Sequence, residues 1–311
     1  MTILLAAALL VPSLFWDKGP ETAHLLEDAG IHKISVPPAL EASWKGVAGI
    51  SVTPVNSSLM QKVPPPSIKR QRRMASATMA PWVDSNGWRF LRDPGATYFY
   101  DATGSTAALA AAEAFVFRVH AFVHTDEAGL RPLGQMLAFL CKLKPPDDSS
   151  RVNIGFIDDG SPASGEFMNL LVRRNLLFRV VKQPDPALDL TVKPGSAEYP
   201  ASEASNPALL AEKARASLTD EKRLLRIYGS EVVVGRLYGT RENTQLYLLN
   251  YAAIRMPVDG LRVRVLGDFR HEKISDFGAP NEQLLDVSQN SQATEFTLKD
   301  LSVIAMIDLT R

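Results

Sequence analysis

Acidic side chains at the ends of predicted strands are the residues of this chain best suited to chemistry. Residues 152–181 follow a strand–turn–helix–strand pattern, and Asp158 and Asp159 stand where the first strand ends. In parallel sheets and barrels, sites are built at the carboxyl ends of the strands. Two carboxyl groups in one site can act as an acid and a base. The other carboxylates at predicted strand ends are Asp17, Asp101 and Asp126, and Asp84 and Glu127 lie in nearby loops.

The two adjacent aspartates are expected to have different roles, because neighbouring side chains of an extended segment point to opposite sides. We expect Asp158 to face the site. We expect Asp159 to accept backbone N–H bonds at the start of the next helix, where Ser161 and Pro162 form a typical helix-opening pair.

The elements that must position these acids alternate along the first two thirds of the chain. Strands are predicted at 11–16, 33–36, 49–54, 73–78, 97–100, 121–124, 152–157 and 177–181. Helices are predicted at 20–29, 105–118, 130–144 and 162–174. This alternation predicts an α/β fold with parallel strands joined by right-handed crossovers. Eight strands would fit a TIM-like (β/α)8 barrel over residues 11–200, and a doubly wound sheet with fewer strands is the alternative.

The C-terminal third has a different pattern. A proline-punctuated polar linker with a short helix near 205–218 leads to runs such as EVVVGRLYG, TQLYLLNYA and LRVRVLGDF, which are separated by turns. No helical period runs through them. This pattern predicts an all-β, antiparallel β-sandwich over residues 220–311.

A barrel-like α/β domain followed by a small β-sandwich resembles many secreted glycoside hydrolases. The segments LYLLNYAA, LRVRVLGDF and VIAMIDL are similar to the β-domain that follows their barrels. Residues 152–181 also resemble the first βαβ unit of glutamine-amidotransferase-like domains. Those enzymes need a cysteine in the strand-to-helix elbow, and this segment has none.

The resemblance implies hydrolysis of a glycosidic bond by two carboxyl groups, one protonated and one ionised. We predict Asp158 with either Asp101 or Asp17 as the catalytic pair. Sugar rings stack on aromatic side chains, and three predicted strand ends combine aromatic and acidic residues. The predicted substrate-binding residues are Trp16, Trp82, Asp84, Trp88 and Tyr100.

Two other functions stay open at this stage. The predicted strand ends carry no glutamate, although most glycosidase barrels use at least one, so the chain could be a catalytically degenerate barrel that binds carbohydrate or a partner protein. Alternatively, His124 with Asp126 could form a general-base or metal site, but no third ligand is evident. We therefore predict no metal and no other cofactor, because the chain also has no P-loop and no dinucleotide fingerprint.

Composition limits the choice of partner. Lys+Arg and Asp+Glu both number 34, so no net field attracts nucleic acid or an anionic membrane. The basic run from Lys69 to Arg73 is interpreted as a solvated loop or strand edge. Cys141, the single cysteine, lies in an apolar helical pattern and is expected to be buried and inert. Nothing in the sequence indicates an oligomeric state.

The N-terminal residues 1–15 are apolar, which is typical of an export signal that overlaps the first strand and is too short to span a membrane. A secreted or periplasmic location is expected, although no basic residue precedes the apolar run. No later segment is predicted to insert stably in a membrane.

Overall fold

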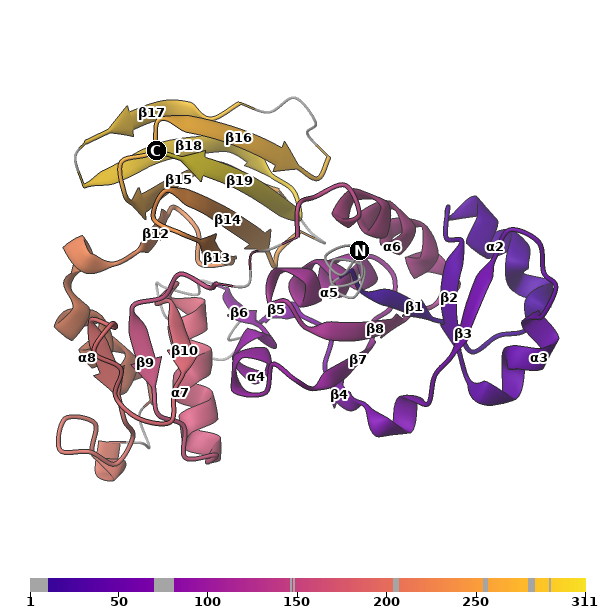
Figure 1. Cartoon of the computed structure of the whole chain (residues 1–311), viewed down its shortest axis with the longest axis horizontal. Helices are drawn as coiled ribbons and strands as arrows, with labels where there is room; N and C mark the ends of the chain where they lie inside the picture. Colours follow the sequence, from indigo (N-terminus) through magenta and orange to yellow (C-terminus); the bar gives the residue numbers. More distant parts are fainter. Residues whose placement is uncertain are drawn as a thin grey trace, which may run out of the picture. The chain divides into compact units, whose positions relative to one another are not determined.

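The computed structural model describes residues 11–69, 81–145, 147, 149–203, 207–253, 257–278, 283–290 and 292–311. The chain forms two compact units, and Figure 1 shows their course. The first unit consists of residues 1–67 with 93–145, and the second of residues 68–92 with 146–311.

The first unit is built on a six-stranded sheet in the order β3-β2-β1-β8-β7-β4. Every neighbouring pair in this sheet is parallel. The strands are β1 (Ser13–Phe15), β2 (Lys33–Val36), β3 (Ser51–Pro54), β4 (Gln61–Val63), β7 (Thr97–Asp101) and β8 (His120–His124). The helices are α2 (Ala23–Asp28), α3 (Glu41–Trp44), α5 (Thr106–Val116) and α6 (Glu127–Leu140), with 3-10 turns at Pro20–Thr22, Pro38–Leu40 and Ser57–Leu59.

The strand order shows two runs wound in the same direction, and the step from β3 to β4 crosses from one edge of the sheet to the other. From β1 through β2 to β3 each step moves one place across the sheet, and from β4 through β7 to β8 the steps move the same way until β8 pairs with β1. Right-handed crossovers in a constant direction put all the connecting helices on one face. A doubly wound sheet reverses direction and has helices on both faces. The sheet of the first unit is therefore not doubly wound, and β3 and β4 are its two edges.

This finding confirms the α/β prediction and corrects its detail. The described residues do not form one closed eight-stranded barrel: six strands form the sheet of the first unit, and the parallel strands that follow belong to a separate sheet. The predicted strand at 73–78, residues 1–10 and most of the basic run lie outside the described residues.

Alternation along the strands sorts the side chains of the first unit into two faces. Leu14, Ile34, Tyr98 and Val123 are at most 1% exposed, as expected for side chains that face the helices. On the opposite face, Phe15, Phe99 and Phe122 form a small apolar cluster with Val55 and Met60 packed against it.

The second unit begins its α/β part with a three-stranded parallel sheet in the order β10-β9-β11. Its strands are β9 (Ile154–Phe156), β10 (Phe178–Val180) and β11 (Leu190–Val192). Helices α4 (Gly87–Arg92) and α7 (Pro162–Arg173) pack together, as do α7 and α8 (Pro207–Lys222). The short strands β5 (Ser67–Lys69) and β6 (Trp82–Asp84) pair with each other, and a 3-10 turn spans Ala201–Glu203. The sequence did not predict α3, α4 or β11.

The predicted β-sandwich is present in the second unit. Two antiparallel four-stranded sheets have the orders β12-β15-β18-β17 and β13-β14-β19-β16. Their strands are β12 (Leu225–Tyr228), β13 (Val233–Gly239), β14 (Asn243–Asn250), β15 (Val258–Leu266), β16 (His271–Asp276), β17 (Leu285–Gln289), β18 (Ala293–Leu301) and β19 (Ile304–Thr310). Alternate side chains such as Leu246, Leu248, Val263 and Ile307 fill a shared core and are fully buried.

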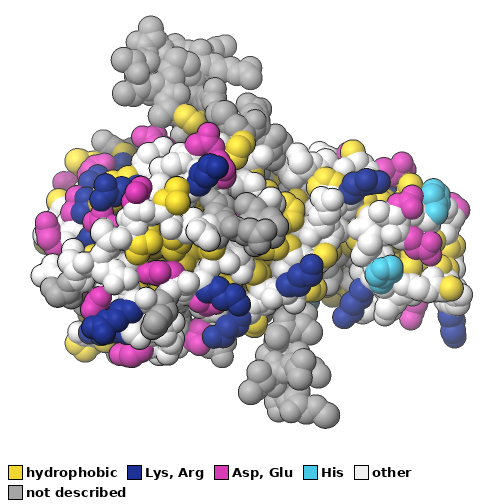
Figure 2. Space-filling view, turned by 90° about the horizontal axis from the view of Figure 1, so that it is seen from above, with side chains coloured by type: hydrophobic (Ala, Val, Ile, Leu, Met, Phe, Trp, Pro, Cys, Tyr) yellow, Lys and Arg dark blue, Asp and Glu magenta, His cyan; other side chains and the backbone are white. Residues whose placement is uncertain are grey.

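Two further observations bear on the sequence-based predictions. Among the described residues, no helix is both long enough and apolar enough to cross a membrane. On the face shown in Figure 2, basic and acidic side chains are interspersed, in keeping with the balanced charge of the chain.

Candidate active site

His124 joins two of the three predicted catalytic aspartates at the carboxyl end of the first unit's sheet. Its Nδ1 lies 2.9 Å from Oδ1 of Asp101, and its Nε2 lies 3.3 Å from Oδ1 of Asp17. The three residues come from the ends of β7, β8 and β1, which are neighbours in the sheet. The His124 side chain is 26% exposed, whereas those of Asp17 and Asp101 are 49% and 73% exposed, so both acids are open to solvent.

The strand register explains why these side chains meet. Asp101 pairs directly with His124 across β7 and β8, and Phe15 pairs with His124 across β1 and β8. Asp17 follows Phe15 by two positions and therefore extends the same face. The ring of Phe99 stacks on the His124 imidazole at 6.3 Å with an interplanar angle of 16°, so the apolar cluster supports the site from below.

The face opposite the helices thus carries three rows of side chains. His120 and Thr97, which are 3.4 Å apart between Nδ1 and Oγ1, stand at the amino ends of their strands. Phe99 and Phe122, which pair with each other, form the middle row, and Phe15 pairs with His124 in the next row. The Asp17–His124–Asp101 group forms the row at the carboxyl ends, which is where barrel enzymes place catalytic residues.

Asp126 has a structural role, and the predicted pairing of His124 with Asp126 is wrong. The Asp126 side chain is the N-cap of α6 and accepts backbone N–H bonds from Gly129 at 2.9 Å and Gly104 at 2.8 Å. The Gly104 bond is the main cause that lowers the pKa of Asp126. Glu127 forms an ion pair with Lys18 at 2.8 Å.

In the part of the chain that the structure describes, no group of three His, Cys, Asp or Glu residues is arranged to hold a metal ion. The geometry around His124 shows the reason at this site. The two carboxylates meet opposite nitrogen atoms of one imidazole ring, so they do not converge on a common point as ligands must.

Asp158 lies in the second unit, at the end of β9, and its carboxylate already accepts two hydrogen bonds. Its Oδ1 accepts hydrogen bonds from Nη2 of Arg92 at 2.8 Å and from the backbone N–H of Gly160 at 3.1 Å. Asp159 accepts the N–H of Ser161 at 2.9 Å. Ser161, rather than Asp159, is the N-cap of α7, because its hydroxyl accepts the N–H of Ser164.

Two of the predicted stacking residues are buried behind the site of the first unit. Trp16 and Tyr100 are both 0% exposed. The indole N–H of Trp16 donates to Thr22 Oγ1 at 2.9 Å, and the Tyr100 hydroxyl donates to Glu113 Oε2 at 2.6 Å. These rings are core residues whose polar atoms are satisfied, and their burial does not suit contact with a sugar.

The remaining predicted substrate-binding residues belong to the second unit. Asp84 forms an ion pair with Lys69 at 2.6 Å. The Trp88 ring lies under the guanidinium groups of Arg89 and Arg92, at 4.3 and 5.2 Å. Trp82 lies beside Arg173 in a cationic pocket.

Cys141 follows the last residue of α6 and is exposed, contrary to the expectation of a buried thiol. The helix ends one residue before Cys141, so the apolar helical pattern that suggested burial does not extend to it.

Sequence comparison identifies no relatives, because no protein-family model and no curated protein matches this chain. Structure comparison does find similar proteins. Alpha-L-fucosidase isoenzyme 2 from Paenibacillus thiaminolyticus superimposes with a TM-score of 0.52 and 8% identity, over 72% of this chain and 62% of that one. The apo exo-carrageenase GH42 from Bacteroides ovatus gives a TM-score of 0.40 and 10% identity, over 89% of this chain and 52% of that one.

A GH42 beta-galactosidase from G. stearothermophilus gives a TM-score of 0.36 and 7% identity, over 96% of this chain and 63% of that one. The chain therefore spans less than two thirds of the length of each of these three proteins. At such low identity the similarity concerns the fold. It confirms the resemblance to glycoside hydrolases that the order of elements predicts.

Proposed function

We propose that this protein is a carbohydrate-active protein of the glycoside-hydrolase type, and that Asp17, Asp101 and His124 form its active site. The observation that carries the proposal is the imidazole of His124 held between two carboxylates at the carboxyl end of a parallel sheet. The fold similarity to the fucosidase supports it. We also propose that this sheet is a (β/α) barrel opened between β3 and β4.

The site offers the acid and the base that hydrolysis requires. A neutral imidazole has one N–H donor and one acceptor nitrogen. When a neutral imidazole bridges two carboxyl groups, one carboxyl donates to the acceptor nitrogen and the other accepts from the N–H. A protonated imidazole instead donates to two ionised carboxylates. The neutral form is the one proposed here, because glycoside hydrolysis uses one protonated and one ionised carboxyl.

The two distances suggest how the roles divide. Asp101 is held more closely by Nδ1 of His124 and keeps the ring oriented. The longer contact between Nε2 and Asp17 is the one that a sugar hydroxyl or a water molecule can displace. The proton shared by Asp17 and His124 passes to the departing glycosidic oxygen. The ionised carboxylate of Asp101 accepts a proton from the attacking water, and proton exchange through His124 then restores the starting state.

Asp158 stays in the proposal as the weaker candidate. Its Oδ1 accepts hydrogen bonds from Arg92 and Gly160, and catalysis would have to break one of them. The Arg92–Asp158 pair also joins α4 to the loop before α7, which gives Asp158 a structural role of its own.

Kinetics of aspartate variants test the proposal. The purified chain is assayed against a panel of aryl glycosides, and Asp17→Asn, Asp101→Asn and Asp158→Asn are compared with Asp28→Asn, a change at an exposed acid on α2. We expect kcat to fall by about 10²–10⁴-fold in the Asp17 and Asp101 variants, the usual range for loss of a general acid or base, and to change little in the other two. Turnover that survives in Asp101→Asn would rule out the assigned roles.

The second candidate is a catalytically inactive barrel that binds carbohydrate or a partner protein. Two observations favour it. The Asp17–His124–Asp101 group contains no glutamate, and both imidazole nitrogens of His124 already contact carboxylates of the group. Failure of wild-type protein to hydrolyse any glycoside, together with retained binding in a glycan-array measurement, would support this candidate. Export from the cytoplasm is part of the proposal in either case, and carbohydrate recognition is part of it unless the ligand is a partner protein.

A further inference from the structure

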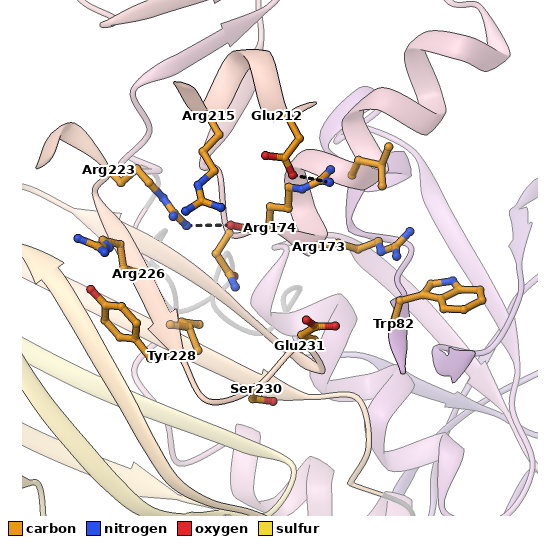
Figure 3. Close-up of a pocket in the computed structure, with 13 residues that line it drawn as sticks. Trp82, Arg173, Arg174, Glu212, Arg215, Arg223, Arg226, Tyr228, Ser230 and Glu231 are labelled. Atoms are coloured by element: carbon orange, nitrogen blue, oxygen red, sulfur yellow. Dashed lines mark hydrogen bonds and ion pairs between the residues drawn. The ribbon is translucent and has the colours of Figure 1, made fainter. Parts of the chain in front are cut away.

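The second unit contains a cationic pocket of about 460 Å³ that has no part in the proposed hydrolysis. It is lined by five arginines from three neighbouring segments, as Figure 3 shows. Arg173 and Arg174 stand at the end of α7, Arg215 lies on α8, Arg223 follows α8, and Arg226 lies on β12. A volume of this size suits a monosaccharide-sized ligand.

The carboxylates that line the pocket are fewer than its arginines. Glu212 pairs with Arg174 at 3.0 Å. Asp220 is shared among Arg215, Arg223 and Arg226, at 3.5, 3.3 and 3.5 Å. At or beside the pocket, five guanidinium groups meet three carboxylates, those of Glu212, Asp220 and Glu231. Glu166 and Asp84 attract the Arg173 cation from outside the lining. Arg173 has no carboxylate within ion-pair distance among the described residues.

Two arginines that line the pocket each have a buried nitrogen without an acceptor. Nη1 of Arg174 and Nε of Arg223 are both buried and make no hydrogen bond within the described part of the chain. Both atoms are shielded from the open volume of the pocket, so they show how closely the two arginines are packed and are not a contact surface for a ligand. Burial also lowers the pKa of Arg173 and Arg223, which shows that these cations are partly desolvated although arginine stays charged.

Helix electrostatics explains only part of this arrangement. Arginines at the end of α7 favour the helix dipole, and Arg223 Nη2 donates to the carbonyl of Arg174 at 3.0 Å. The dipole does not account for Arg215 or Arg226, which approach the pocket from α8 and β12. A concave site where several guanidinium forks meet is the arrangement that recognises planar or tetrahedral oxyanions.

We propose that this pocket binds the oxyanion group of an acidic ligand, a carboxylate, sulfate or phosphate. Aromatic rings stand at opposite sides of it in Figure 3: Trp82 lies 5.7 Å from the guanidinium of Arg173, and Tyr228 lies 5.0 Å from that of Arg226. These rings provide apolar surfaces for a ring that carries the anion. The inference is independent of the hydrolase assignment, because every residue of the pocket belongs to the second unit.

Isothermal titration calorimetry on the full chain tests the proposal. The probes are sodium sulfate, sodium phosphate and sodium glucuronate, with glucose as the neutral analogue of glucuronate, all at constant ionic strength set by sodium chloride. The variants are Arg173→Gln and Arg215→Gln. The control is Arg179→Gln on β10, which removes a surface arginine paired with Asp185 outside the pocket.

We expect at least one oxyanion to bind, glucose not to bind, and the affinity to fall about tenfold or more in each pocket variant while the control matches wild type. Tighter binding of glucuronate than of the inorganic ions would identify an acidic sugar as the ligand, and the reverse order would identify a free anion. Thermal unfolding establishes that each variant is folded. The proposal is overturned if no oxyanion binds, or if both folded pocket variants bind as tightly as wild type.

Discussion

Nδ1 of His124 lies 2.9 Å from Oδ1 of Asp101, across two adjacent parallel strands at the end where they leave the sheet. A carboxylate on one imidazole nitrogen sets the tautomer and the ring orientation, so that the other nitrogen is free to exchange protons. Asp17 occupies the position in front of that second nitrogen. This arrangement supports the proton transfer that we propose for the group at a solvent-exposed edge.

Replacing His124 is the sharpest test of this organisation. For His124→Asn we predict a fall in kcat of about 10²–10⁴-fold with a smaller change in KM, because proton transfer is lost while the acids remain. His120→Asn on the same strand and the same face is the matched control and is expected to retain kcat. Steady-state kinetics over a range of pH measure both. A pH–rate profile of His124→Asn identical to that of wild type would contradict a role in proton exchange.

The helix cap at Asp126 is expected to make the first unit sensitive to acid. Asp126→Ala removes the acceptor for Gly129 N–H and Gly104 N–H, and loss of an N-cap costs about 1 kcal/mol. The hydrogen bonds lower the pKa of Asp126, so its stabilising effect is complete above the unfolded-state pKa near 3.9 and is lost as pH falls through the lower folded-state pKa.

Thermal unfolding of wild type and Asp126→Ala at pH 7 and in strong acid measures this effect. The difference in Tm should be largest at pH 7 and should shrink in acid. Asp126→Asn retains a capping oxygen and is expected to lose less stability at pH 7. A Tm difference that is the same at both pH values would show that the charge of Asp126 does not contribute.

Gly134 permits the close approach of α6 to the end of α2. A Cβ at this position would lie 2.0 Å from the carbonyl oxygen of Ala29, which is backbone and cannot rotate away. We predict that Gly134→Ala destabilises the protein by about 1–3 kcal/mol, since this clash outweighs the helix propensity gained with alanine. Gly95→Ala, where a Cβ meets nothing within 4 Å, is the control for urea unfolding. Equal unfolding midpoints for the two variants would disprove the close approach.

Asn175 connects the end of α7 to β13 within the second unit. Its backbone has a φ of 54°, its Nδ2 donates to the carbonyl of Val233 at 3.1 Å, and its Oδ1 accepts the N–H of Gly235 at 2.7 Å. Asn175→Ala loses both buried hydrogen bonds and also strains the left-handed backbone, which should cost about 2–4 kcal/mol.

Asn175→Gly separates these two contributions. Glycine accepts the positive φ, so this variant should lose only the hydrogen bonds and be the more stable of the two in urea unfolding. If the glycine variant is as stable as wild type, the bonds to Val233 and Gly235 contribute nothing measurable.

Much of the local structure could be predicted because it depends on neighbours in the chain. The alanine-rich run at 105–118 has high helix propensity and forms α5, and the Ser161-Pro162 pair begins α7 as expected. The alternating runs after Leu225 form the predicted sandwich, since one face of each strand must be buried. Short elements such as α3 and β11 carry too few residues to show a period.

The proposed active-site group was only partly predictable. Asp17 and Asp101 were predicted as catalytic because each follows a predicted strand, and this role stays a prediction. The alternative pairing of His124 with Asp126 differs from the contacts in the structure. Asp126 is the nearest acid in sequence, yet it lies at the start of α6 and bonds to backbone N–H groups there. On each of two strands a phenylalanine stands two positions before a polar residue: Phe99 before Asp101, and Phe122 before His124. Residues two apart lie on the same face of a strand, so this spacing was the available signal. It becomes informative only when the two strands are known to be neighbours.

The sequence by itself determined the kinds of element, their order and the acids at the strand ends, because propensity, alternation and capping act over a few residues. Tertiary structure alone decided which strands are adjacent. The pairing of β8 with β1, more than 100 residues apart in the chain, brings His124 to Asp17, and the packing of α7, α8 and β12 gathers five arginines around one pocket. Such long-range pairings depend on burying the whole sheet and on the handedness of its crossovers, which no short stretch of sequence encodes.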